Sequence, residues 1–281
     1  SAVHQPTNLS PSERTEATAE EACEGLSGTN PETIINEANK NLYEGASEEE
    51  IKEALILSSR SLVEAEPNYT YATSRILLDG LRTEALSFLE IAPNATHAEM
   101  EKLYPKTLNT YIKKAIDLEL INPELGKMDL EKLGESLNPE RDLMFSYLGL
   151  QTLYDRYFIH KDEVRFELPQ IFFMRVAMGL AIGEENREDR AIEFYNLLSS
   201  FDYMSSTPTL FNSGTIHSQL SSCYLTTVPD DLKGIYDALG DNAMLSKWAG
   251  GLGNDWTPVR GMGAHIKLSL IHISEPTRPY L

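Results

Sequence analysis

Residues with hydroxyl groups gather in one stretch of the chain, and a cysteine follows them. The run SSTPTLFNSG occupies residues 205–214, and Ser221, Ser222 and Cys223 come shortly afterwards. Hydroxyl groups and backbone N–H groups in such a loop can bind a phosphate without net positive charge. A cysteine on a strand beyond the loop can act as a redox group or a nucleophile. The alternative for a lone cysteine in an apolar strand is a buried small hydrophobe.

The elements around this stretch suggest an α/β arrangement. SCYLTTV, at 222–228, alternates and is rich in β-forming residues, which predicts a strand. Residues 235–248 have a helical pattern, after which Gly250, Gly251 and Gly253 are expected to break regular structure. A strand, a loop and a helix after a long helical region predict the opening of an α/β domain.

Helix-start signals dominate the region before residue 200. Residues 1–20 are polar and without periodicity, which predicts a loose tail. The predicted starts are Asn30-Pro31-Glu32, the capping boxes at Ser47 and Thr96, and Pro169. The remaining expected elements are a helix around 76–89, helices up to about 135, a buried helix over 143–158, a short strand at 164–168 and a helix over 187–200.

Composition excludes several classes of protein. The chain has 281 residues, 41% of them hydrophobic, and a net charge of −19, so it can bury a core but repels nucleic-acid phosphates. Neither a membrane span nor a signal peptide is expected. Its two cysteines, Cys23 and Cys223, lie too far apart in the sequence for a disulfide framework, which favours a reducing cytoplasm.

The last residues break all patterns. LSLIHISEPTRPYL, at 268–281, resembles the translated read-through of a transposon-type sequencing adaptor. We therefore expect native sequence to end near Lys267 and residues 268–281 not to belong to the native fold.

Several consecutive blocks give the chain its family resemblance. It resembles the large (alpha) subunit of class I, aerobic ribonucleotide reductase, as an N-terminal fragment. The matching blocks are RDLMFSY (141–147), GLQTLYDRYF (149–158), QIFFMRVAMGLA (170–181), STPTLFNSGT (206–215), QLSSCYL (219–225) and WAGGLGNDWTPVRGMGAHIK (248–267).

The resemblance implies a mainly α fragment that leads into a truncated ten-stranded α/β barrel. The implied divisions are a tail (1–20), a degenerate ATP-cone-like domain (21–92), the family's N-terminal helical domain (93–214), the start of the catalytic barrel (215–267) and the adaptor artefact (268–281).

The resemblance also implies a reaction. In the family a thiyl radical removes the ribose 3′ hydrogen, the 2′ hydroxyl leaves as water, and two cysteines become a disulfide. Cys223 matches the reducing cysteine of the first barrel strand, while Thr209, Ser222 and Gly251 match positions at the substrate. The alternatives are that Thr209 shapes a turn, Ser222 caps a strand end and Gly251 breaks a helix.

A site for a deoxynucleoside triphosphate effector is implied too. Asp230, Asp231 and Leu232 match the loop that holds its deoxyribose, and Arg260 and Lys267 match cations at its phosphates. The alternative for the two aspartates is a helix N-cap ahead of Leu232, and the two roles are compatible.

The cone-like domain departs from the family's ATP-binding pattern. Its opening basic motif is absent, and positions expected to contact ATP hold Glu48, Lys52, Asp79 and Thr83. Carboxylates repel a triphosphate, so we expect no ATP binding, or an intact cone upstream of this chain.

The implied partners are a radical-generating, metal-containing small (beta) subunit, a second alpha chain, and thioredoxin or glutaredoxin as reductant. No cofactor or metal is expected on this chain itself, and effectors are dNTPs or ATP. Because the thiyl-forming cysteine lies downstream in the family and Cys23 resembles a core residue, the fragment should not turn over alone. The alternatives are a cobalamin-dependent reductase and a non-catalytic helical module.

Overall fold

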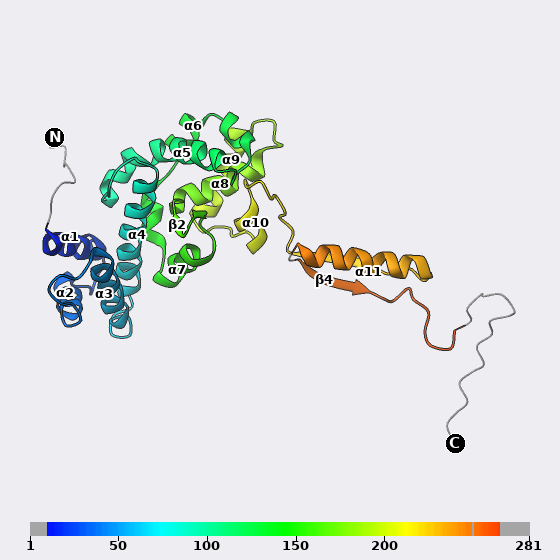
Figure 1. The fold of residues 1–281 in the computed structure, drawn as a ribbon, viewed down its shortest axis with the longest axis horizontal. Coiled ribbons are helices and arrows are strands. Elements are labelled where there is room, and N and C mark those ends of the chain that lie inside the picture. Colours follow the sequence, from blue (N-terminus) through cyan, green and yellow to red (C-terminus); the bar gives the residue numbers. More distant parts are fainter. Residues whose placement is uncertain (1–9, 249, 265–281) are drawn as a thin grey trace, which may run out of the picture. The chain divides into compact units, whose positions relative to one another are not determined.

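The computed structural model describes residues 10–248 and 250–264 (Figure 1). They divide into two compact units, one ending at Leu220 and the other beginning at Ser221. Helices dominate, and the few strands form two small sheets, so the predicted mainly α chain that opens an α/β domain is confirmed. Lys267 and the predicted adaptor segment lie outside the described residues.

The first unit contains the long series of helices. In chain order its α-helices are α1 (Pro11–Cys23), α2 (Pro31–Asn39), α3 (Glu48–Ser61), α4 (Tyr69–Phe88), α5 (Met100–Asp117), α6 (Leu130–Glu135), α7 (Tyr147–Arg156), α8 (Pro169–Ala181), α9 (Arg187–Ser199) and α10 (Thr207–Asn212). Short 3₁₀ helices lie between some of them: η1 (His97–Glu99), η2 (Pro123–Lys127) and η3 (Pro139–Met144).

Helix α1 corrects the prediction of a loose tail over residues 1–20, which is wrong from Pro11 onward. The Ser10 hydroxyl accepts a hydrogen bond from the Glu13 backbone N–H at 3.3 Å, and the Glu13 carboxylate accepts one from the Ser10 N–H at 2.8 Å. This capping box starts the helix, and Ala19 and Ala22 are buried on its inner face. Small alanines supply the packing that the polar composition concealed.

Helices α1 to α4 enclose a small hydrophobic core. Two predicted starts are confirmed, because Asn30 caps α2 and Ser47 forms a capping box with Glu50 at α3. Cys23 is buried in this core as predicted, and burial raises the pKa of its thiol. The other buried members are Ala22, Ile34, Ala38, Ala54, Leu55, Tyr69, Ala72 and Ile76.

Helix α4 links this small core to a larger one within the same unit. Its residues up to Ile76 pack in the small core, whereas those from Leu77 onward pack in the large core. Figure 1 shows α4 between α1–α3 and the later helices of the unit. The two cores share one helix, so a domain boundary at residue 92 stays a prediction.

The large core is centred on α8, most of whose residues are buried. The predicted start of α8 at Pro169 is confirmed. The prediction that the helix over 143–158 is buried is wrong, because Leu150 is the buried residue of α7 and Leu148 is 75% exposed. Only one stripe of α7 meets the core, so its apolar excess overstated its burial.

A short hairpin replaces the strand predicted over 164–168. Strand β1 (His160–Lys161) pairs antiparallel with β2 (Val164–Arg165). Asp162 and Glu163 between them both have positive φ, as a two-residue hairpin turn requires. The strand is shorter than predicted because the next residues leave the ladder and enter the core before α8.

The second unit is a strand–helix–strand arrangement. Strand β3 (Cys223–Thr227) is followed by α11 (Leu232–Lys247) and β4 (Gly251–Asp255), and the strands pair in parallel with Cys223 opposite Gly251. The predicted strand and helix are confirmed. The predicted irregular structure at Gly251 and Gly253 is wrong, because these glycines belong to β4.

Close packing explains glycine in and beside β4. A Cβ placed on Gly253 would lie 2.9 Å from the Leu225 side chain, and one on Gly250 would lie 2.1 Å from the Tyr224 ring. Side chains of β3 fill the space that other residues would need. Glycine here marks close approach within a sheet rather than a break.

The second unit begins six residues later than the predicted boundary at 215. Thr215 forms an isolated bridge with Ile121, and the side chain of Asn212 donates a hydrogen bond to the Gln219 carbonyl at 2.7 Å. These contacts tie the connecting segment to the first unit.

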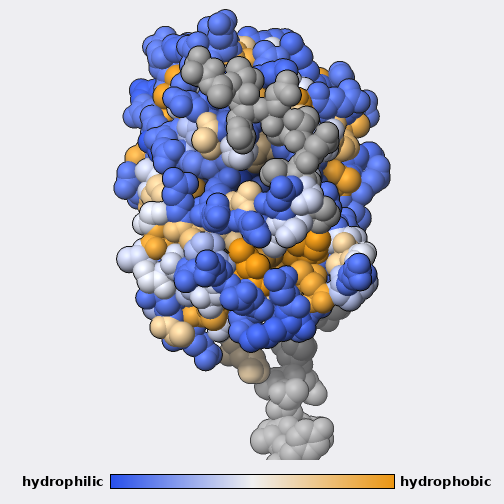
Figure 2. All heavy atoms as spheres, turned by 90° about the vertical axis from the view of Figure 1, so that its left-hand side faces the viewer, coloured by the Kyte–Doolittle hydropathy of each residue, from blue (hydrophilic) through white to orange (hydrophobic). Residues whose placement is uncertain are grey.

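The face of the molecule drawn in Figure 2 is largely hydrophilic. Figure 2 looks onto the side of the molecule where α1–α3 lie in Figure 1, and hydrophobic residues gather there in the lower half of the face. Tyr43 and Leu57 are among the exposed large hydrophobic residues of this part of the chain. Within the described residues, none of the helices has the length and apolar character needed to cross a membrane.

Candidate functional site

The predicted reaction residues of the second unit meet at one end of its sheet. The Gly251 N–H donates to the Ser222 carbonyl at 3.0 Å, just before the Cys223–Gly251 pair. A Cβ on Gly251 would lie 3.6 Å from the Cys223 Sγ, so the thiol lies directly beside this backbone. Cys223 is exposed within the described residues, as are Leu225 and Thr227 on the same face of β3. The end of β3 thus presents an accessible thiol over side-chain-free backbone, which a small substrate can approach closely.

The predicted effector residues lie at the opposite end of the same two strands. Arg260 Nε lies 2.8 Å from Asp230 Oδ2 and 3.0 Å from Oδ1, and the Arg260 backbone N–H also donates to Asp230. Asp231 caps α11 by accepting from the Gly234 N–H at 2.8 Å, which confirms its role as an N-cap. Leu232 is 73% exposed. A five-residue strand spans about 15 Å, so this cluster lies roughly that far from Cys223.

Thr209 belongs to the first unit, in the short helix α10. Its hydroxyl donates to the Leu220 carbonyl at 3.2 Å and lies 3.5 Å from the Ser206 Oγ. The side chain is partly exposed. Since its proton is engaged by Leu220, donation to a bound phosphate requires the hydroxyl to rotate away from that carbonyl.

A buried arginine that sequence reasoning missed supports α10. Arg175 Nη1 donates to the Ser213 carbonyl at 2.7 Å and Nη2 donates to the Leu210 carbonyl at 3.2 Å. On its other side the guanidinium meets Glu167, with Nε–Oε2 at 2.8 Å and Nη2–Oε1 at 3.0 Å. Both side chains are fully buried, and the Tyr111 hydroxyl donates to the same carboxylate.

The sequence carried a signal for this pair. Arg175 interrupts the apolar run QIFFMRVAMGLA, and Glu167 stands among buried residues just before Pro169. A charge in a buried helix needs an opposite charge and hydrogen-bond partners. Two opposite charges within one apolar stretch therefore indicate a buried ion pair, although not what it holds.

A second buried polar cluster surrounds Asp142, within the first resemblance block. Its carboxylate accepts from the Tyr104 hydroxyl at 2.6 Å and from Gln170 Nε2 at 2.7 Å. The Tyr195 hydroxyl donates to the Gln170 Oε1 at 2.5 Å. Burial raises the pKa of Asp142 to about 6 and that of Tyr195 to about 12.

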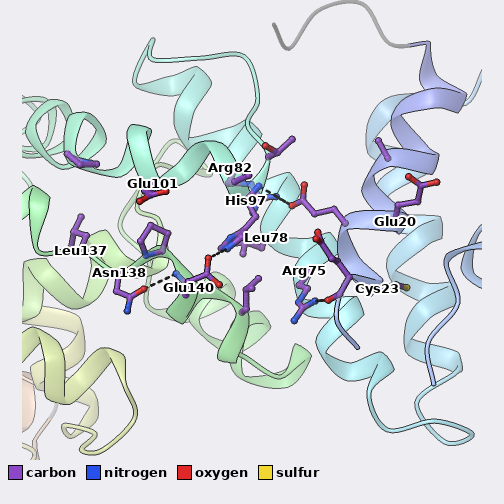
Figure 3. Close-up of a pocket in the computed structure, with 18 of the residues that line it drawn as sticks. Glu20, Cys23, Arg75, Leu78, Arg82, His97, Glu101, Leu137, Asn138 and Glu140 are labelled. Atoms are coloured by element: carbon purple, nitrogen blue, oxygen red, sulfur yellow. Dashed lines mark hydrogen bonds and ion pairs between the residues drawn. The ribbon is translucent and has the colours of Figure 1, made fainter. Parts of the chain in front are cut away.

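A large hollow in the first unit lies between α1, α4 and the elements from η1 to η3, with a volume of about 1600 Å³ (Figure 3). Arg82 Nη2 lies 2.6 Å from the Glu21 Oε1 at its wall, and Arg82 Nε donates to the Ala95 carbonyl at 2.8 Å. His97 Nε2 lies 3.0 Å from Glu140. Further glutamates line the hollow, so it does not suit a polyanionic nucleotide.

The four altered cone positions come together in a smaller hollow of about 550 Å³. Glu48, Lys52, Asp79 and Thr83 all line it, together with Arg14. Arg14 Nη2 donates to the Thr83 hydroxyl at 3.1 Å, and Nη1 lies 3.6 Å from Glu48. The Arg14 guanidinium is therefore already directed at a carboxylate and a hydroxyl.

Metal ligands do not cluster in the part of the chain that the structure describes. Within residues 10–248 and 250–264, no group of three or more His, Cys, Asp or Glu side chains could hold a metal ion.

Comparisons with known proteins agree with this arrangement. A family model described as the ribonucleotide reductase all-alpha domain matches residues 143–218, and one described as the barrel domain of that enzyme matches residues 221–274. The two matches meet where the two structural units divide. The second match runs past Lys267, so the adaptor origin of 268–281 stays a prediction.

Named relatives extend the similarity over most of the chain. The ribonucleoside-diphosphate reductase subunit alpha of Chlamydia muridarum is 48% identical over 248 residues, 88% of this chain and 23% of the relative. The subunit alpha of Helicobacter pylori is 35% identical over 88% of this chain and 30% of the relative. The large chain of Schizosaccharomyces pombe is 30% identical over 87% of this chain and 29% of the relative.

The chain thus spans about a quarter to a third of these relatives. Their names, subunit alpha and large chain, give no support to the cobalamin-dependent alternative. The barrel-domain match likewise disfavours a purely helical regulatory module. The chain belongs to the ribonucleotide reductase large (alpha) subunit family.

Proposed function

We propose that this chain is part of a ribonucleoside-diphosphate reductase alpha chain that reduces ribonucleotides to deoxyribonucleotides for DNA synthesis. The observation that carries the proposal is the accessible Cys223 thiol beside Gly251, inside the stretch matched by the barrel domain. A thiol at the end of a strand, next to a glycine without a side chain, can approach a sugar closely. A reducing thiol needs that access because it must supply hydrogen and electrons.

Cys223 is one of two thiols oxidised in the reaction. Each turnover removes the 2′ hydroxyl as water and converts two thiols to one disulfide, so electrons and protons balance. Thioredoxin or glutaredoxin then reduces the disulfide for the next turnover. A metal-containing beta subunit supplies the radical that starts the reaction. Thr209 and Ser222 bind the substrate's phosphates and sugar, and Gly251, which has no side chain, leaves room for the substrate.

Asp230, Asp231, Leu232 and Arg260 contribute to a dNTP effector site between two alpha chains; Lys267 is its further expected cation. The support is local: Asp230 and Arg260 lie in contact, a carboxylate suits a 3′ hydroxyl, and a guanidinium suits phosphate. Effector binding must then open or share this ion pair.

The cone-like part binds no ATP and acts as packing for the following helices. The support is the charge of the smaller hollow, where carboxylates outnumber Arg14 and Lys52. A triphosphate would meet repulsion there. The proposed location of the whole enzyme is the cytoplasm.

The test is Cys223→Ser in the complete reductase that contains these residues, assayed with its beta subunit and a dithiol reductant. We expect loss of multiple turnover with effector binding retained, because serine cannot form the disulfide. Arg260→Ala serves as the contrast and should weaken effector binding while leaving the chemistry intact. Sustained turnover by the Cys223 variant would contradict the assignment.

A further inference from the structure

The helix that carries Thr209 is held by a single buried guanidinium. We propose that Arg175 is a positioning residue for substrate recognition: it holds the carbonyl groups at the end of α10 and thereby fixes the Thr209 hydroxyl. The inference rests on the proposed role of Thr209 at a substrate phosphate.

The Arg175 guanidinium binds the C-terminal end of α10. Its donors reach three carbonyls at the end of α10, those of Leu210 at 3.2 Å, Phe211 at 3.4 Å and Ser213 at 2.7 Å. The last carbonyls of a helix have no partner further along that helix. A cation there supplies the missing donors and interacts favourably with the helix dipole. Arg175 therefore sets where α10 ends and how it is oriented.

The Arg175 guanidinium is itself held in place by Glu167. Glu167 takes the other side of the guanidinium through two contacts, at 2.8 and 3.0 Å. Both side chains are fully buried. A planar fork held on one side by a carboxylate can present its remaining N–H groups in only one direction. The buried Arg175–Glu167 pair thus holds the end of α10 in a fixed position.

Two further residues, Tyr157 and Gly179, limit the freedom of this segment. The Tyr157 ring stacks on Phe211 with 4.5 Å between centroids, and its hydroxyl lies 3.2 Å from the Thr207 Oγ1. Gly214 lies so close to α8 that a Cβ on Gly179 would be 2.1 Å from its nitrogen. With its ends held, α10 presents Thr209 from a rigid support, as precise ligand positioning requires.

A role in stability alone makes a different prediction. The Tyr111 hydroxyl donates to Glu167 and lies beside the Arg175 guanidinium, and among the described residues Tyr111 makes no hydrogen bond to an α10 carbonyl. Tyr111→Phe therefore weakens the same buried cluster without removing any bond to α10. It is the matched control for Arg175→Lys, which keeps the charge beside Glu167 but loses the fork.

The first measurement is hydrogen exchange in the 281-residue chain. The amides of Leu210, Ser213 and Thr215 hydrogen bond within the segment and report its order. We expect Arg175→Lys to speed their exchange about tenfold and Tyr111→Phe to change it less than about twofold. Equal acceleration by both variants, or none by Arg175→Lys, would overturn the inference.

The second measurement uses the complete reductase with its beta subunit. We expect Thr209→Val to raise the KM for the ribonucleotide, and Arg175→Lys to raise it about tenfold with kcat changed less than about twofold. In a Thr209→Val background, Arg175→Lys should add little, because both changes affect one contact.

These outcomes separate the two proposals. An unchanged KM in Thr209→Val would refute the substrate role of Thr209 itself. A raised KM in Thr209→Val together with an independent, fully additive effect of Arg175→Lys would refute only the positioning role. If Arg175→Lys does not fold, Tyr157→Leu releases α10 from its other side and is subject to the same criteria.

Discussion

Asp142 gives the sharpest prediction about stability. Its carboxyl is buried and accepts hydrogen bonds from Tyr104 and Gln170. Asp142→Asn keeps the shape and removes the titrating group. Because one of the two acceptor oxygens is replaced by a donor amide, the variant loses one hydrogen bond at every pH. What changes with pH is the cost of the buried charge in the wild type.

The sign and size of this pH-dependent change in stability follow from the pKa of Asp142. The pKa of Asp142 rises from 3.8 in the unfolded chain to about 6 in the folded chain, chiefly because of burial. The folded state therefore binds the Asp142 proton more tightly than the unfolded state. The contribution of this proton to the free energy of unfolding is fully present below pH 3.8 and is lost as pH rises through 6. The shift corresponds to about 3 kcal/mol, of which about 2 kcal/mol falls between pH 4 and pH 7.5.

Urea unfolding of the 281-residue chain at both pH values measures this difference. The free energy of unfolding of Asp142→Asn, relative to wild type, should increase by about 2 kcal/mol from pH 4 to pH 7.5. The exposed Asp117→Asn controls for the change in net charge and should show no such trend. A pH-independent difference for Asp142→Asn would refute the argument that burial raises its pKa.

Three other predictions test the packing and the cone-like part. Arg82→Ala should lower the free energy of unfolding by about 2 to 3 kcal/mol, since it strips Glu21 and the Ala95 carbonyl of a buried donor, whereas the exposed Arg156→Ala should change it little in urea unfolding. Gly179→Ala should cost about 1 to 3 kcal/mol by the same assay because its Cβ would meet the Gly214 backbone, while Gly183→Ala, with open space around it, should stay within about 0.5 kcal/mol. Calorimetric titration of the chain with ATP should give no Kd below about 1 mM, and a micromolar Kd would contradict the proposed loss of binding.

Local signals in the sequence predicted most helices because their physics is local. The caps at Asn30, Ser47 and Thr96 specify helix starts through contacts with residues two or three positions away. Helix α1 was missed although Ser10 and Glu13 form the same box, because its buried face consists of small residues, namely Thr15, Ala19, Ala22 and Cys23. Strand β4 was missed because its glycines depend on side chains of β3, which lie far away in the sequence.

The candidate site likewise has parts that the sequence predicts and parts that it does not. Cys223, Gly251, Asp230 and Arg260 were identified through resemblance, and their pairing across β3 and β4 follows from one parallel register. The support beneath Thr209 could not be predicted. It depends on Arg175 reaching the end of a helix more than thirty residues away, and sequence patterns carry no such distance information.

The oxidation state of Cys223 after one turnover shows whether this residue is a reducing thiol. The complete reductase, fully reduced, is mixed with its beta subunit, effector and substrate in the absence of dithiol, quenched, and mapped by alkylation and mass spectrometry. We predict that Cys223 enters a disulfide in step with deoxyribonucleotide formation and remains free when substrate is omitted. A Cys223 that stays equally free in both samples while product forms would contradict it.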